Sequence, residues 1–118
     1  MSLRKSCAYN FLGDYPQAIE YLQQSSIIFR EIGNRNGEGS GLGNLGNAYL
    51  SLGDYPQAIE YHQQHLTIAR EIGNRNGEGT ALGSLGNAYN FLGDHTQAIE
   101  YHQQSLTIAR EIGDRNAE

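Results

Sequence analysis

The chain of 118 residues has one cysteine, one lysine, no tryptophan and no valine. Because Cys7 is alone, there is no intramolecular disulfide and no multi-thiolate metal site, and we expect a reducing, cytoplasmic location. The formal charge of −5 argues against nucleic acid and against an anionic membrane surface, which both need a basic face. No apolar run approaches the ~18–20 residues of a membrane span, and no signal peptide follows Met1.

Apolar side chains are also scarce. Leucine, isoleucine and phenylalanine together supply only 25 of the 118 residues, close to the range typical of disordered chains. Glycine supplies 15 residues, nearly twice its average share of about 7%. A single compact core would therefore be thin, and the chain needs an architecture with little core per residue.

A 40-residue repeat provides that architecture. Residues 41–78 and 81–118 are identical at 29 of 38 positions, and residues 8–40 and 48–80 at 25 of 33. A fixed period of this length is typical of a stacked array, in which each unit buries its apolar face against its neighbours. We predict a single domain, 1–118, with repeats at 1–33 (its first helix truncated), 34–73 and 74–113, and the start of a further helix at 114–118.

Each repeat contains two helical patterns. In the first helix of repeat 2, residues 40–52, a narrow apolar stripe recurs at helical spacing: Leu42, Leu45, Tyr49 and Leu52. The second helix, residues 56–72, has a wider apolar face. Between them Gly53 suits a left-handed helix end, and Asp54 predicts an N-cap that forms a capping box with Gln57. Equivalent caps for the first helices are predicted at Asn34, Asn74 and Asp114.

Glycine is concentrated in the first helices. Residues 37–46 contain five glycines, which together cost about 5 kcal/mol of helix propensity relative to alanine. This cost equals the whole stability of many small domains. We therefore expect the first turns of these helices to stay loop-like.

The pattern resembles a known family. Leu42-x-x-Leu45-Gly46-x-x-Tyr49, followed by Gly53, Tyr55 and Ala58, is similar to the tetratricopeptide helix-turn-helix signature. The 40-residue spacing resembles the subclass of Leu-Gly-Asn-repeat (Pins-type) proteins and kinesin light chains. The resemblance implies an all-α, right-handed superhelical solenoid of antiparallel helix pairs, about three repeats long. It also implies that the first helix of each repeat lines a concave groove that binds a protein or peptide.

The groove face of the first helices is polar and varies between repeats, whereas the apolar stripe is copied unchanged. We predict as groove residues Asn10 in repeat 1, Ser40, Gly43, Asn44, Asn47, Leu50 and Ser51 in repeat 2, and Thr80, Gly83, Ser84, Asn87, Asn90 and Phe91 in repeat 3. Asparagine side chains both donate and accept hydrogen bonds, and so pair with the backbone of a bound segment. There is no Lys/Arg clamp for a carboxylate terminus. We predict an interaction scaffold without a cofactor.

Catalytic and metal sites are not indicated. Nothing in the sequence assembles an acid, a base and a nucleophile, and Glu20, Glu60 and Glu100 recur on the polar face as solvated residues. The glycine-rich stretch 37–43 follows no strand and lacks lysine, which argues against phosphate binding. His62 and His65 have a spacing that suits metal ligation, but we interpret them as packed histidines hydrogen-bonded to polar neighbours, with no metal.

The alternative function is structural. The repeats would then be self-assembly units that oligomerise by end-to-end stacking or helix exchange. Two interpretations of the chain stay open, a fragment of a longer array or a complete small protein. In both, Leu106, Ile108 and Ile112 lack the following helix that would cover them. We therefore expect self-association into a homo-oligomer through a heterologous contact between exposed ends.

Overall fold

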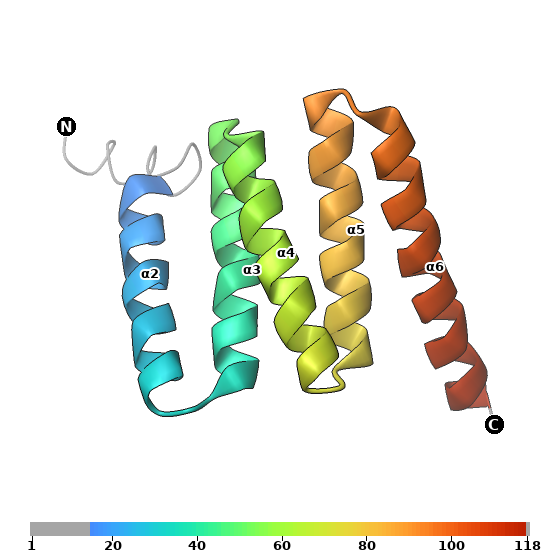
Figure 1. Cartoon of the computed structure of the whole chain (residues 1–118), viewed down its shortest axis with the longest axis horizontal. Coiled ribbons are helices and arrows are strands. Elements are labelled where there is room, and N and C mark those ends of the chain that lie inside the picture. Colours follow the sequence, from blue (N-terminus) through green and yellow to red (C-terminus); the bar gives the residue numbers. More distant parts are fainter. Residues whose placement is uncertain (1–14, 118) are drawn as a thin grey trace, which may run out of the picture.

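Five helices follow one another in the computed structural model, which describes residues 15–117 (Figure 1). They are α2 (Tyr15–Glu31), α3 (Arg35–Leu52), α4 (Tyr55–Glu71), α5 (Arg75–Leu92) and α6 (His95–Ala117). Consecutive helices run antiparallel and pack against each other, and α3 also touches α5. The predicted all-α repeat solenoid is confirmed, and the first helix of repeat 1 lies outside the described residues.

The turns between helices follow the glycine and cap pattern. Gly33, Gly53, Gly73 and Gly93 all have φ between +71° and +95°, the left-handed region that glycine adopts without strain. The Oδ1 atom of Asn34 accepts from the N–H of Gly37 at 2.9 Å, and that of Asp54 from the N–H of Gln57 at 3.3 Å. These caps are as predicted. However, the capping box is incomplete. In a capping box the side chain of Gln57 would accept from the N–H of Asp54. This N–H instead donates to the carbonyl of Tyr49, in the last turn of α3, at 2.9 Å.

The end of the chain differs from the prediction. Gly113 and Asp114 lie inside α6, which continues to Ala117, so Asp114 caps no new helix. The turns at Gly33 and Gly73 are each followed by a full helix that folds back on the preceding one. Hydrogen bonding within α6 satisfies the backbone of residues 114–117 instead.

The core lies along the row of helices. Leu42 and Leu45 of α3 are buried, as are their copies Leu82 and Leu85 of α5. The prediction for Leu52 was wrong, because it ends α3 and is 47% exposed. Stacked tyrosines join the two helices of a repeat: the ring centroids are 5.4 Å apart in both pairs, Tyr49 with Tyr61 and Tyr89 with Tyr101.

The glycine-rich first turns are helical, which corrects the expectation of loops. Helix α3 begins at Arg35 and includes all five glycines. Side chains of the neighbouring helices occupy the space that a Cβ would take. A Cβ on Gly37 would meet the ring of Phe29 at 2.6 Å, and one on Gly46 would meet the ring of His62 at 2.6 Å. Burial of these rings against α3 offsets the propensity that the glycines lose.

A carboxylate is buried at the start of each first helix. Glu38, whose side chain is only 4% exposed, accepts from Arg30 at 3.2 Å and from Arg35 at 2.9 Å. Repeat 3 forms the same cluster around Glu78. Burial opposes ionisation of Glu78, but hydrogen bonds from its two arginines outweigh it, and the pKa of Glu78 lies below its ordinary value. These clusters tie the start of α3 and α5 to the end of the preceding helix.

We expect the substitution Glu38→Gln to lower the free energy of unfolding by about 1–2 kcal/mol. It keeps the side-chain shape but removes the charge that two hydrogen bonds recognise. Urea unfolding measures the loss, with the exposed Glu60→Gln as the control, expected to stay within about 0.5 kcal/mol of the parent. Equal effects of the two substitutions would contradict this role for Glu38.

Candidate binding groove

The polar faces of α3 and α5 meet over a small hollow of about 200 Å³. Six of its lining residues are predicted groove residues: Ser40, Gly43, Asn44 and Asn47 from α3, and Thr80 and Ser84 from α5. Two histidines of α4, His62 and His65, complete the lining. The hollow is therefore walled by hydroxyls and amides from two first helices.

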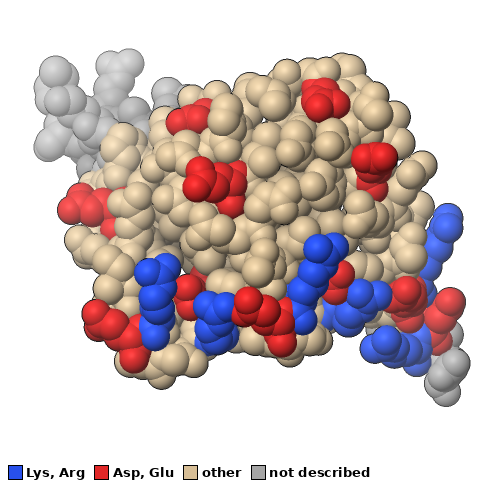
Figure 2. Space-filling model, viewed as in Figure 1, with Lys and Arg blue, Asp and Glu red and all other residues tan. Residues whose placement is uncertain are grey.

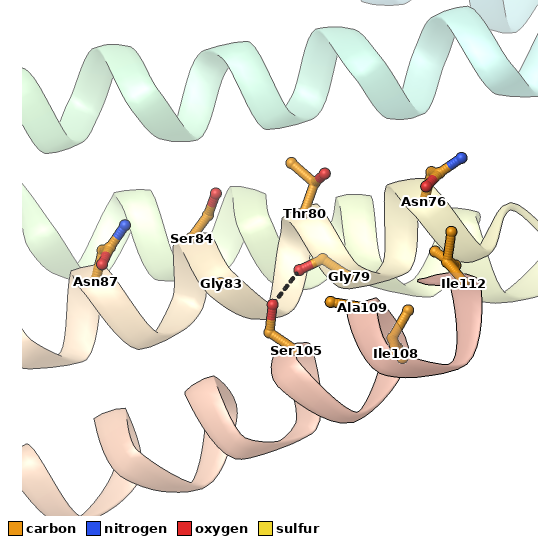
Figure 3. Close-up of a pocket in the computed structure, with 10 residues that line it drawn as sticks. All are labelled: Asn76, Gly79, Thr80, Gly83, Ser84, Asn87, Ser105, Ile108, Ala109 and Ile112. Carbon is orange, nitrogen blue, oxygen red and sulfur yellow. Dashed lines mark hydrogen bonds between the residues drawn. The ribbon is translucent and has the colours of Figure 1, made fainter. Parts of the chain in front are cut away.

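A larger hollow of about 520 Å³ lies next to it, between α5 and α6. Asn76, Thr80, Ser84 and Asn87 extend from one side of α5, and α6 supplies Ser105, Ile108, Ala109 and Ile112 (Figure 3). The hydroxyl of Ser105 donates to the carbonyl of Gly79 at 2.9 Å, which holds α6 close to α5. Thr80 and Ser84 line both hollows, so the two lie side by side along α5; we term them together the track, which has an apolar side on α6.

The last turn of each first helix is not part of this track. Of the predicted residues, Leu50 and Ser51 of α3 line neither hollow, and nor do Asn90 and Phe91 of α5. Asn90 is hydrogen-bonded to the Nδ1 atom of His95 at 2.8 Å, and Phe91 stacks on Tyr55 with ring centroids 5.7 Å apart. These contacts hold the turn that follows α5. Asn10 lies outside the described residues.

Sequence reasoning missed several lining residues. Asn76 lies in the first turn of α5, which the glycine count predicted to be a loop. Ala109 of α6 was not singled out, and Ile112 was expected only to lack a covering helix, although the wall of the larger hollow includes both. The position of His65 in the groove could have been predicted from the repeat. His65 occupies the position of Ser105 in repeat 3, where the side chain is small. Its larger ring fits because the facing residue, Gly43, has no side chain.

The two histidines of α4 have different environments. His62 is 1% exposed, and neither ring nitrogen has a hydrogen-bond partner within the described part of the chain. The predicted packing is therefore confirmed, but the predicted hydrogen bond is wrong. Burial lowers the pKa of His62 to about 4, with a smaller contribution from the charge of His65. Burial also lowers the pKa of His65, which is half-buried. Both rings are neutral at pH 7.

Among residues 15–117, no Asp, Glu, Lys or Arg side chain lines either hollow. Figure 2 shows that arginines gather along one edge of the molecule, where α2 turns into α3 and α4 into α5. There they alternate with carboxylates, as in the pairs of Arg35 with Glu71 and Arg75 with Glu111. The track is therefore built for hydrogen bonding and apolar contact rather than for charge recognition.

The described part of the chain, residues 15–117, contains no group of three or more His, Cys, Asp or Glu side chains that could hold a metal ion. It also contains no helix that is long and apolar enough to cross a membrane.

The row of antiparallel helix pairs with a polar track along its first helices defines the class of helical repeat scaffolds. The sequence matches the tetratricopeptide repeat family over residues 7–71 and 39–111, and the chain belongs to that family. Domains of this family are generally non-catalytic scaffolds for protein–protein interaction. No curated protein matches the sequence.

Among solved structures, the tetratricopeptide repeat domain of FLU from Arabidopsis is similar. Its TM-score is 0.79, and the alignment covers 92% of each chain. The sequence identity is 19%, so this likeness concerns the fold alone.

Proposed function

We propose that the chain binds a segment of a protein partner along the track formed by α3 and α5. The observation that carries the proposal is that the two hollows lie side by side along α5 and share Thr80 and Ser84. Asn44, Asn47 and Asn87 supply amides that both donate and accept, and such groups pair with a peptide backbone whatever its side chains are. The absence of charged lining residues favours an uncharged stretch of the partner over a carboxylate terminus.

The larger hollow favours a partner segment that carries an apolar side chain. Ile108, Ala109 and Ile112 give it an apolar wall opposite the polar side chains of α5. A partner segment in extended or helical form would place an apolar side chain against this wall, while its backbone bonds to the amides. In the smaller hollow the ring of His65 lies against Gly43 and takes up part of the space. This hollow therefore accepts only a small group.

A random-peptide display library tests this proposal. Peptides selected on the chain should bind at least tenfold more weakly to the double variant Asn47→Glu/Asn87→Glu, because its carboxylates fill the track and repel backbone carbonyls. Ser51→Glu/Asn90→Glu is the matched control, with the same charge change on the same two helices but outside both hollows. Fluorescence anisotropy gives the affinities. Selection of no peptide, or equal weakening by the two double variants, would refute the groove.

We also propose that the chain self-associates, as a second function. Leu106 of α6 is 50% exposed and Ile99 is 57% exposed, and both lie on one helix at the end of the row. Apolar side chains at the end of a repeat array favour association. We further propose that the protein acts in the cytoplasm and without catalysis, since its lone cysteine suits a reducing compartment and its groove contains no charged acid or base.

A further inference from the structure

The smaller hollow lies between three helices in the middle of the row. Its lining residues come from α3, α4 and α5, and each of these helices contacts the other two. The hollow therefore has a wall on every side within residues 15–117. Its size and polarity are set by side chains that these three helices hold in place.

One residue distinguishes this hollow from the equivalent place in the next repeat. Residues 57–71 and 97–111 are identical except at one position, where α4 has His65 and α6 has Ser105. The Nδ1 atom of His65 lies 2.7 Å from the place of a Cβ on Gly43, and the Oγ atom of Ser105 lies 3.3 Å from that on Gly83. In repeat 2 the imidazole ring therefore fills space that the serine of repeat 3 leaves to the larger hollow.

The lining of the smaller hollow is polar, and part of it has no hydrogen-bond partner. His62 lines the hollow and is 1% exposed, and neither of its ring nitrogens has a partner among the described residues. Because unpartnered buried polar atoms are unfavourable, an occupant that forms hydrogen bonds is favoured over an apolar one. Asn44, Asn47 and His65 add further donors and acceptors. A hydroxyl is the smallest side-chain group that both donates and accepts.

We propose that His65 determines which side chain of a bound partner enters this hollow, and that it admits the hydroxyl side chain of a serine or threonine. The inference deepens the proposed function and rests on it. The ring excludes a long apolar side chain because it occupies the space beside Gly43, and its nitrogens are able to bond to the hydroxyl. The partner segment then carries two different anchors, a hydroxyl residue at the smaller hollow and an apolar residue at the larger one.

The peptides selected by display on the parent chain test this assignment. Their alignment should contain one position enriched in serine and threonine. Replacing that residue by leucine in a synthetic peptide should weaken binding to the parent chain at least tenfold, because the longer side chain overpacks the hollow. The same replacement should weaken binding to His65→Ser by less than about threefold, because the ring is gone. Fluorescence anisotropy gives the four affinities.

The repeat itself supplies the fold argument and the control. His65→Ser recreates the arrangement of repeat 3, in which the serine packs beside glycine and donates to the carbonyl of Gly79 at 2.9 Å, so this variant should fold. Ser105→His makes the reverse exchange at the equivalent position of α6. It alters the larger hollow only, and should keep the parent's tenfold discrimination against leucine at the hydroxyl position.

A second measurement uses the parent chain. Binding of the selected peptide should shift the ring NMR signals of His62 and His65. It should leave unchanged those of His102, which is exposed on α6 and lines neither hollow.

The outcomes separate this inference from the groove itself. Selection of no peptide would refute the groove and the role of His65 together. Peptides that Asn47→Glu/Asn87→Glu weakens, but that contain no position enriched in serine or threonine, would overturn the role of His65 and leave the groove supported. An equal leucine penalty in the parent chain and in His65→Ser would do the same, as would ring signals of His65 that do not respond to the peptide.

Discussion

Replacing His62 by leucine will flatten the dependence of folding stability on pH between about pH 7 and pH 4. In the folded chain burial lowers the pKa of His62 to about 4, whereas an unfolded histidine titrates near 6.5. As the pH falls through 6.5, the unfolded chain takes up a proton that the folded chain does not accept. Unfolding is therefore favoured progressively, by roughly 3 kcal/mol at pH 4. Above pH 6.5 the ring is neutral in both states and this loss is absent.

The low pKa of His62 follows from the surroundings of its ring. Its edge lies against Gly46 of α3, and its two nitrogens have no hydrogen-bond partner among the described residues. A proton added there would have no acceptor, and His65, one turn along the same helix, would repel it when charged. Leucine has no group to protonate and leaves no buried polar atom unsatisfied, so it removes the pH-dependent loss.

Urea midpoints measured from pH 7.5 to pH 4.0 test this prediction. His102→Leu is the matched control, since His102 is the copy of His62 on α6 and its ring is exposed. The parent chain and His102→Leu should lose stability in parallel as the pH falls, and His62→Leu should lose about 3 kcal/mol less. Parallel profiles for all three proteins would show that His62 does not resist protonation.

Replacing Gly46 by alanine will destabilise the chain, although alanine is the better helix former. The new Cβ would lie 2.6 Å from the ring of His62, which is buried between the helices with 1% exposure. Overpacking of this kind costs about 1–3 kcal/mol and outweighs the gain of about 1 kcal/mol in helix propensity. We expect a net loss of about 1 kcal/mol in the free energy of unfolding.

Gly86→Ala provides the opposite result at the equivalent position. Its Cβ would meet the ring of His102 at 2.7 Å, but that ring is exposed on α6 and rotates away. The propensity gain then dominates, and stability should rise by up to about 1 kcal/mol. The free energies of unfolding of the two variants, measured by thermal or urea unfolding, should thus differ by about 2 kcal/mol. Destabilisation of the same size in both would show that the packing of α3 and α5 is equally tight.

Much of the groove was predictable, because its residues follow from the helical period. Ser40, Asn44 and Asn47 share one face of α3 by their spacing alone, and the structure places all three around the same hollow. Asn90 shares that periodicity but not the site. It bonds to His95 of the following helix, and the sequence contains no signal for a contact across the turn.

The first turns of α3 and α5 show why local propensity was insufficient. Five glycines predict a loop when residues 37–46 are considered alone. The helix forms because Phe29 from one side and His62 from the other pack against those glycines. Helix propensity depends on the segment alone. The stabilisation of this helix comes from side chains of the neighbouring helices, which only the tertiary structure brings into contact with it.

The amino-acid sequence by itself determined the repeat, the helix order and the glycine and cap residues of the turns, because each depends on spacing within a few residues. The tertiary structure decided which copies of one side chain are buried. Leu66 and Leu106 occur in the same local sequence, yet α5 covers the first and no described helix covers the second. Burial depends on neighbours in space, and a 40-residue repeat gives its copies the same side chains but different neighbours.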